Sequence, residues 1–386
     1  MSTGRPPREP RDRPPLRARL RRVALKLGLV VLFLEVALRA ATWFAYGRDP
    51  YYLLYGFQGA VSQVNVSPWS VFTGRHYKYP PNYALRGAAG QAGETAHTNA
   101  LGFRGPDFEP AKPPGTLRVF CMGGSSTFGF HNDDDETYPH YLQEILAADA
   151  ATAHVEVINA GFPYYHSGTI RALLEQELVG YAPDLITIYS AYNDTAWPLE
   201  VGPWQGAVLW LQEHSITCLV LQRTILTDRN IYRLLGRLGA GGSRGRAGLA
   251  DEVKRFAARY RANLEALAAL ARRAGFELLL IRQPMTTVTT NPSFAGLTYE
   301  EEYRGVLAKL EAGEWLSRFD LCLLRHHRLI EELDLLAERE GLAVIDNIRL
   351  LDDHRELLAS WVHLEPEANR MLAEELARFL RDRVSR

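Results

Sequence analysis

The feature that most constrains the fold of this chain is a regular alternation of strand and helix patterns from about residue 116 to the C-terminus. Short apolar runs alternate with segments whose apolar residues recur at helical spacing. The expected strands cover residues 117–122, 155–158, 184–189, 276–282 and 342–346, and the expected helices cover 138–150, 168–181, 255–274, 315–340 and 366–384. This alternation predicts an α/β fold, a doubly wound parallel sheet in which ligands bind beyond the carboxyl ends of the strands.

The composition narrows the classes of partner and cofactor. A formal net charge of -1 gives no overall field that would attract nucleic acid, so no nucleic-acid partner is expected. The three cysteines, Cys121, Cys218 and Cys322, lie far apart in apolar settings, so no disulfide is expected. The histidines lack partners at zinc-ligand spacing, and neither a metal nor another cofactor is expected.

A basic N-terminal tail, residues 1–26, precedes an apolar segment at residues 27–45. About 20 apolar residues are needed to span a bilayer, so residues 27–45 are expected to form an uncleaved transmembrane anchor. Glu35 and Arg39 interrupt the segment, but at i,i+4 spacing they can pair on one helix face. The positive-inside rule then predicts a single-pass membrane protein whose main domain is extracytoplasmic. An interfacial helix and a cleaved signal peptide stay open as alternatives.

Two further segments stand apart from the regular pattern. Residues 46–115 are rich in Tyr, Pro and Gly, and are expected to form an irregular lead-in to a domain covering residues 116–386. Residues 197–249 form an insertion between the third and fourth strands and end in a glycine-rich linker. This insertion is interpreted either as a cap or membrane-facing subdomain, or as extra core helices with a disordered loop.

Residues 123–129, Gly-Gly-Ser-Ser-Thr-Phe-Gly, form a tight turn between the first expected strand and a helix. Such a turn can expose the Ser125 hydroxyl and leave its backbone N–H for an oxyanion. A phosphate-binding loop is an alternative, although the turn lacks the usual G-K-[ST] ending. A plain connection between strand and helix is equally open for this turn taken alone.

Three later positions supply the other groups that a serine nucleophile needs. Gly161 follows the second expected strand, where its backbone N–H could face the same pocket, and Asn193 follows the third with an uncharged side-chain donor. His363 lies just before the C-terminal helix and could act as general base. Each of these alone is explained by turn chemistry or by a structural histidine.

In this order the residues resemble the SGNH hydrolases, the GDSL-type esterase and lipase superfamily, over about residues 99–384. The family's first block, G-D-S-x-[ST]-x-G, is similar to residues 123–129, with Gly124 in place of the aspartate. The third block, G-x-N-D, is similar to residues 191–194, with Ala191 in place of the glycine. The fifth block, D-x-x-H, is similar to residues 360–363, with Ser360 in place of the aspartate.

The resemblance implies a flavodoxin-like, three-layer α/β/α fold. It implies that Ser125 is the nucleophile, that His363 is the base, and that Gly161 and Asn193 form the oxyanion hole. Residues 98–105 and 367–373 also resemble a membrane-anchored bacterial branch, for which the domain would be periplasmic.

Ser360 leaves the partner of His363 open, because a serine cannot stabilise an imidazolium as a carboxylate does. One interpretation is a Ser–His dyad oriented by Ser360 or by a backbone carbonyl. A second is a carboxylate from elsewhere in the chain: Asp352, Asp353 or Asp194. A third is an inactive relative.

The function expected from these residues is a serine esterase that hydrolyses small-molecule, glycan or lipid esters through an acyl-enzyme. An O-acyltransferase acting on envelope glycans and a non-catalytic glycan- or lipid-binding relative are the alternatives. Arg104, Arg282 and Gln283 are polar candidates for substrate contact, although structural capping is the commoner role of such residues.

Overall fold

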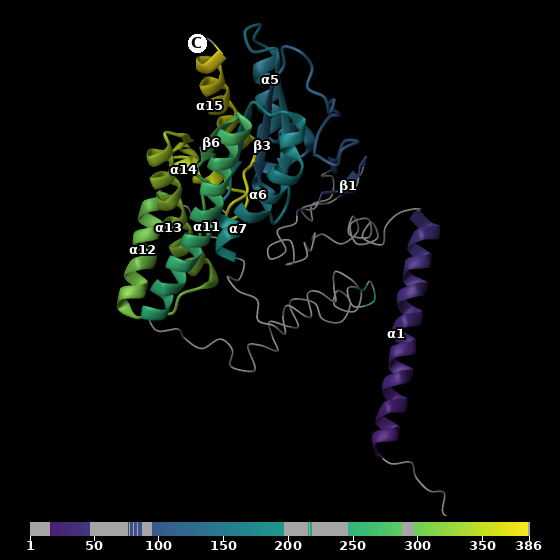
Figure 1. Cartoon of the computed structure of the whole chain (residues 1–386). Coiled ribbons are helices and arrows are strands. Elements are labelled where there is room, and N and C mark those ends of the chain that lie inside the picture. The colour runs from purple at the N-terminus through teal and green to yellow at the C-terminus, as the bar shows by residue number, and fades with distance from the viewer. Residues whose placement is uncertain are drawn as a thin grey trace, which may run out of the picture. The chain divides into compact units, whose positions relative to one another are not determined.

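A computed structural model of the chain describes residues 16–46, 76, 78–79, 81–82, 84–86, 95–196, 215, 217, 246–287 and 297–384 (Figure 1). Most of the basic tail, of the lead-in before residue 95 and of the insertion at residues 197–249 lies outside these ranges. The chain divides into two compact units, Met1–Leu53 with Trp210–Leu238, and Leu54–Leu209 with Gly239–Arg386.

The second unit is built on a five-stranded parallel sheet. Its strands are β3 (Leu117–Gly123), β4 (Val155–Gly161), β5 (Leu185–Tyr189), β6 (Glu277–Ile281) and β7 (Ala343–Ile345). They lie in the order β4-β3-β5-β6-β7, and every neighbouring pair is parallel. This is the flavodoxin-like order of a doubly wound sheet, so the expected fold class is confirmed.

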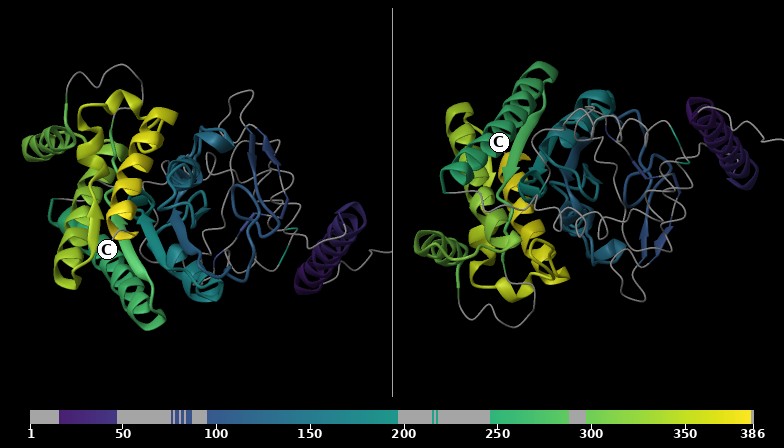
Figure 2. Two further views of the ribbon diagram at one scale, coloured as in Figure 1. Left: turned by 90° about the horizontal axis from the view of Figure 1, so that it is seen from above. Right: turned by 90° about the horizontal axis from the view of Figure 1, so that it is seen from below.

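Helices cover both faces of the sheet, which gives three layers (Figure 1, Figure 2). One face packs against α6 (Ser167–Gln176), α11 (Arg246–Ala274) and α13 (Arg318–Glu340), and the other against α5 (Tyr138–Ala147) and α15 (Pro366–Val384).

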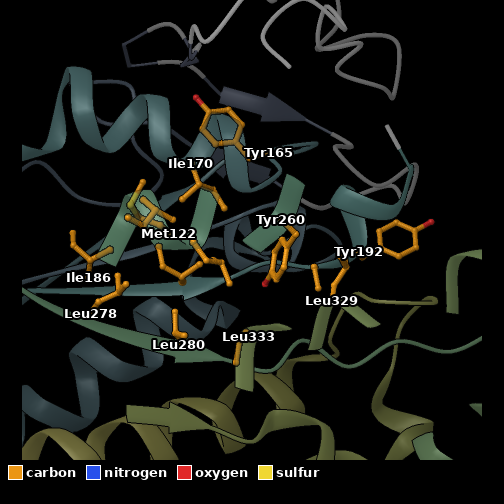
Figure 3. Packing of buried hydrophobic residues seen from close by; sticks show 14 of the residues in the cluster. Met122, Tyr165, Ile170, Ile186, Tyr192, Tyr260, Leu278, Leu280, Leu329 and Leu333 are labelled. Carbon is orange, nitrogen blue, oxygen red and sulfur yellow. The ribbon is translucent and has the colours of Figure 1, made fainter. Parts of the chain in front are cut away.

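Alternate residues of the strands enter the two hydrophobic clusters, because successive side chains of a strand point to opposite faces. Phe120 and Met122 of β3 belong to the first cluster, whereas Val119 and Cys121 belong to the second. Figure 3 shows part of the first cluster, including Met122. Both faces of the strands are therefore buried, which explains why they read as continuous apolar runs rather than as alternating ones.

Shorter elements connect this framework. They are β1 (Ala84–Arg86), β2 (Thr95–His97), α4 (Ser125–Phe128), α7 (Tyr192–Ala196), α12 (Tyr299–Ala312) and α14 (Asn347–Asp352), with single 3₁₀ turns at Asp134–Glu136, Leu178–Tyr181 and Arg355–Leu357. Helix α12 was not predicted. Its start has a capping box formed by Thr298 and Glu301, and Gly313 ends it with a φ of 74°.

The lead-in differs from the expected irregular segment ending at residue 115. Phe103 is fully buried in the first cluster, and Arg104 forms isolated bridges with Thr98 and with Asn159 of β4. Residues 95–108 thus belong to the folded domain, because their apolar side chains complete its core. The end of the insertion differs too, since α11 already begins at Arg246.

The expected anchor at residues 27–45 lies within a single helix, α1 (Leu16–Tyr46). Arg39 Nε donates to Glu35 Oε1 at 2.8 Å, as the i,i+4 spacing predicts. Across the described parts of the chain, however, no helix has both the length and the apolar character needed to cross a membrane. The predicted transmembrane helix is therefore not supported.

Candidate active site

Ser125 is the first residue of α4, directly beyond the carboxyl end of β3, an interior strand that lies between β4 and β5. Gly124 is the N-cap of this short helix, and Gly129 ends it with a left-handed φ of 85°. The N–H groups of a helix's first turn have no acceptor within the helix. The local fold therefore presents both the half-buried Ser125 hydroxyl and its N–H at the edge of the sheet.

Asn193 of α7 lies against the turn before Ser125. Its Nδ2 donates to the Tyr165 carbonyl at 2.8 Å, so the loop after β4 holds the amide in place. A Cβ at position 124 would come within 2.6 Å of Asn193 Nδ2, and only a glycine leaves the amide this room. Because the amide has two hydrogens, one remains for an oxygen bound beside Ser125.

His363 reaches Ser125 from the loop before α15. Its Nε2 lies 2.8 Å from Ser125 Oγ, within the range needed for proton transfer. The neighbouring Val362 carbonyl accepts a hydrogen bond of 2.9 Å from Ser126 Oγ, which ties this loop to α4. Two side chains 238 positions apart in the chain thus lie within hydrogen-bond distance of each other.

The other ring nitrogen of His363 is bonded to Ser360. The distance from Ser360 Oγ to His363 Nδ1 is 2.7 Å. When Nδ1 carries the proton and donates it to Ser360, Nε2 is left with a lone pair that faces the Ser125 hydroxyl. This arrangement corresponds to the dyad interpretation with Ser360 as the orienting group.

The alternative carboxylates are engaged elsewhere or remain apart. Asp352 accepts from the Tyr299 N–H at 2.8 Å, and the fully buried Asp194 accepts from Ser167 and Ser190. Asp353 is exposed. Within the described ranges, no carboxylate forms a hydrogen bond with His363.

The surroundings of His363 keep its ring uncharged. Burial lowers the pKa of His363 to about 3, and the nearby His131 ring adds to this shift. The His131 and Phe130 ring centroids lie 5.1 Å and 5.2 Å from that of His363. A neutral imidazole can accept the Ser125 proton, as a general base must.

Gly161, the other predicted oxyanion donor, has its N–H directed at a side-chain acceptor in the structure. This N–H donates to Asn159 Oδ1 at 3.0 Å. A Cβ at Gly161 would lie 2.3 Å from the Phe128 nitrogen, which shows that Gly161 lets α4 pack closely on β4.

In the loop that follows β4, Tyr164 has a left-handed φ of 65°, which is uncommon for a bulky residue.

Arg104 and Arg282, the other two candidates for substrate contact, are bonded to groups of the protein itself. The buried Arg104 guanidinium donates to the carbonyls of Phe128 and Gly129, each at 2.7 Å. Arg282 pairs with Asp334 and Asp346. Arg104 thus supports the end of α4, and Arg282 links β6 to its neighbours.

Gln283, which the sequence suggests only as a candidate for substrate contact, joins three parts of the site. Its Oε1 accepts from the N–H groups of Ala191 and Tyr192, each at 2.9 Å, and its Nε2 donates to Ser126 Oγ at 3.1 Å. The one available sequence signal was its place after the fourth expected strand.

Comparisons with known proteins gave distant structural similarities. No family model matches the chain, and no curated protein matches it. The solved structures similar to it include an acetyl xylan esterase, at 14% identity and a TM-score of 0.40, covering 68% of this chain and 100% of that one.

Two others are a putative lipolytic protein of the G-D-S-L family from Desulfitobacterium hafniense and a lipase/acylhydrolase from Enterococcus faecalis. The first has 12% identity and a TM-score of 0.39, covering 68% of this chain and 99% of that one. The second has 16% identity and a TM-score of 0.40, covering 69% and 97%. At this level of similarity, the chemistry of this chain has to follow from its own side chains.

Proposed function

We propose that this protein is a serine ester hydrolase with Ser125 as nucleophile and His363 as general base. The observation behind this proposal is the 2.8 Å contact between Ser125 Oγ and His363 Nε2, with the opposite ring nitrogen bonded to Ser360. A serine hydroxyl is a weak nucleophile until a neighbouring base takes its proton.

The reaction proceeds in two halves. His363 Nε2 takes the Ser125 proton while Oγ bonds to the ester carbonyl carbon, and the carbonyl oxygen becomes an oxyanion. When the carbonyl re-forms, the bond to the leaving oxygen breaks and Nε2 returns the proton to the alcohol. Water, activated by the same nitrogen, then attacks the acyl-enzyme and releases the acid and free Ser125.

The Ser125 N–H and the Asn193 amide are the proposed oxyanion donors. The Ser125 N–H lies in the first turn of α4, where no helical acceptor exists. The Asn193 amide is held in place by the Tyr165 carbonyl, so it does not have to reorganise during the reaction. Removing one such donor typically costs about 10²–10³ in turnover.

The test is hydrolysis of p-nitrophenyl acetate by the wild type and by Ser125→Ala. We expect the variant to lose almost all turnover above the uncatalysed rate. Among the described residues, Ser125 is the one hydroxyl that contacts His363 Nε2, so the variant has no nucleophile in its place. A serine-reactive phosphonate should form its adduct on Ser125, located by peptide mass spectrometry. Ser125→Ala provides the control, since it should form no adduct with the phosphonate.

Equal turnover in the wild type and Ser125→Ala, or an adduct on another residue, would reject the proposed mechanism. Adding acceptor sugars to the same assay distinguishes hydrolysis from acyl transfer. Free acid is expected as the product, and a new sugar ester in its place would identify a transferase.

We also propose that residues 27–45 hold the protein at a membrane, with the catalytic domain on the extracytoplasmic side. Apolar side chains of α1 are exposed, among them Leu32 at 59% and Phe33 at 70%, and arginines precede them in the same helix. An exposed apolar helix surface beside basic residues is typical of a segment that associates with lipid.

A further inference from the structure

Gln283 lies just beyond the carboxyl end of β6 and is 4% exposed. A buried side-chain amide is costly unless its donors and acceptor have partners. The partners of Gln283 are distributed over three separate segments: the start of α7, the helix α4 and, through Ser126, the loop of His363.

The orientation of the amide follows from its acceptor side. Gln283 Oε1 receives two backbone N–H groups, from Ala191 and Tyr192, both at 2.9 Å. An amide nitrogen could not accept these bonds, so the oxygen has to face α7. Both donors directly precede Asn193, the side chain that lies against the turn of Ser125.

The donor side reaches the other two segments. Gln283 Nε2 donates to Ser126 Oγ at 3.1 Å, and Ser126 Oγ donates to the Val362 carbonyl at 2.9 Å. Ser126 follows the nucleophile in the chain, and Val362 precedes the base. One continuous chain of hydrogen bonds therefore joins the segments that present Ser125, Asn193 and His363.

We infer that Gln283 is a positioning residue, which holds the oxyanion donor Asn193 and the base His363 in register with Ser125. The inference rests on the proposed ester hydrolysis. A misplacement of about 1 Å in a catalytic group can cost about 10² in rate. A change at Gln283 should therefore reduce turnover through its effect on Asn193 and His363, although the Gln283 side chain itself is buried.

The chain offers a matched control in Gln143 of α5. Gln143 Nε2 donates to the Val155 carbonyl at 3.1 Å, and its Oε1 accepts from the Val157 N–H at 2.7 Å. This amide also bridges two backbone groups, but it does so at the start of β4, the end of the strand opposite to the site. Loss of either glutamine removes hydrogen bonds between a side-chain amide and its neighbours. Gln283 alone of the two belongs to the hydrogen-bond chain that connects α7 with the His363 loop.

The kinetic experiment compares Gln283→Met, Gln283→Glu and Gln143→Met with the wild type, all in the full chain. With p-nitrophenyl acetate, we expect kcat to fall about a hundredfold in Gln283→Met with KM changed much less. Gln143→Met should lower the Tm without this loss of kcat.

Gln283→Glu adds a signature that a purely structural role would not produce. An ionised carboxylate still accepts from Ala191 and Tyr192 but cannot donate to Ser126, whereas a protonated one can. Between about pH 8 and about pH 5 the variant's kcat should rise as the pH falls, because a buried carboxyl takes up its proton in this range. The wild type should show no such rise. A pH-independent kcat in Gln283→Glu at the wild-type level would overturn the inference.

NMR signals of the His363 ring test the inference without any need for turnover. Gln283→Met should shift them, and Gln143→Met should leave them in place. Unshifted signals in folded Gln283→Met overturn the positioning role whether or not the protein hydrolyses esters. Shifted signals in a protein whose wild type shows no hydrolysis and no Ser125 adduct support the positioning role and reject the proposed function alone.

Discussion

His363 has a serine, Ser360, where the resemblance leads one to expect an aspartate. The hydroxyl orients the ring through Nδ1 but brings no negative charge to stabilise an imidazolium. Burial and His131 both lower the pKa of His363, and among the residues that the structure describes no carboxylate opposes them. For a general base that works in the neutral form, this means that activity is lost only at a pH well below the usual histidine value of about 6.5.

Ser360→Asp is therefore expected to change both the rate and its pH dependence. A carboxylate favours the charged ring, so the pKa of His363 should rise and the acid limb of kcat/KM should move upward from about pH 3. Turnover above the new limb should increase by about tenfold or more, because loss of the orienting acid in a complete triad costs about 10⁴. The measurement is kcat/KM against pH for both proteins.

Ser360→Ala completes this comparison. It removes the Nδ1 partner without adding charge, and turnover should fall because the ring is no longer oriented. If Ser360→Asp leaves the acid limb where it is in the wild type, the carboxylate does not interact with Nδ1 and the proposed role of position 360 is wrong.

At the scale of elements, two glycines determine how α4 is placed. Gly161 of β4 allows the backbone of α4 to approach, whereas Gly124 leaves room for the Asn193 amide. The closest contact of an added Cβ at Gly161 is with a backbone atom that cannot move aside, whereas at Gly124 it is with the end of a side chain. The same substitution should therefore have different effects at the two positions.

Gly161→Ala should reduce stability, and Gly124→Ala should reduce activity. At Gly161 the added methyl would lie 2.3 Å from the Phe128 nitrogen, and overpacking of this kind costs about 1–3 kcal/mol. At Gly124 it would displace the Asn193 amide and reduce kcat by about 10² or more. Thermal denaturation and esterase kinetics on both variants check this, and a lower Tm in Gly124→Ala with full activity would contradict it.

At the scale of the whole molecule, the proposed nucleophile, base and oxyanion donors belong to a different compact unit from α1. The described residues of the site fall within 95–196, 246–287 and 297–384, whereas α1 belongs to the unit that contains Met1–Leu53. Catalysis on a soluble ester should thus be separable from attachment to a membrane.

Removal of residues 1–46 should leave kcat and KM for p-nitrophenyl acetate unchanged while abolishing binding to anionic lipid vesicles. The basic and apolar residues of α1 are the proposed source of that binding. Vesicle co-sedimentation of the full and shortened chains measures the lipid contact, and protease accessibility in intact cells tests the extracytoplasmic location. Equal sedimentation of both chains would show that α1 is not the attachment segment.

The five strands of the sheet could be predicted to within a few residues, because both of their faces are buried and their apolar runs are continuous. The parallel order follows from helices between the strands. Ser125 and His363 could also be proposed, since the carboxyl ends of parallel strands meet at one edge. The lead-in was less predictable, since Phe103 enters the core through a segment without helical or strand periodicity.

The sequence by itself determined the α/β fold and the residue types available for acyl transfer, because local apolar spacing and glycine turns depend on near neighbours in the chain. The tertiary structure alone decided three contacts. Ser360 is hydrogen-bonded to His363, the Gly161 N–H donates to Asn159, and Gln283 links three segments. The reason is that a hydrogen bond depends on distance and angle in space. Gln283 and Ser126, 157 residues apart, come into contact only when the whole sheet has formed.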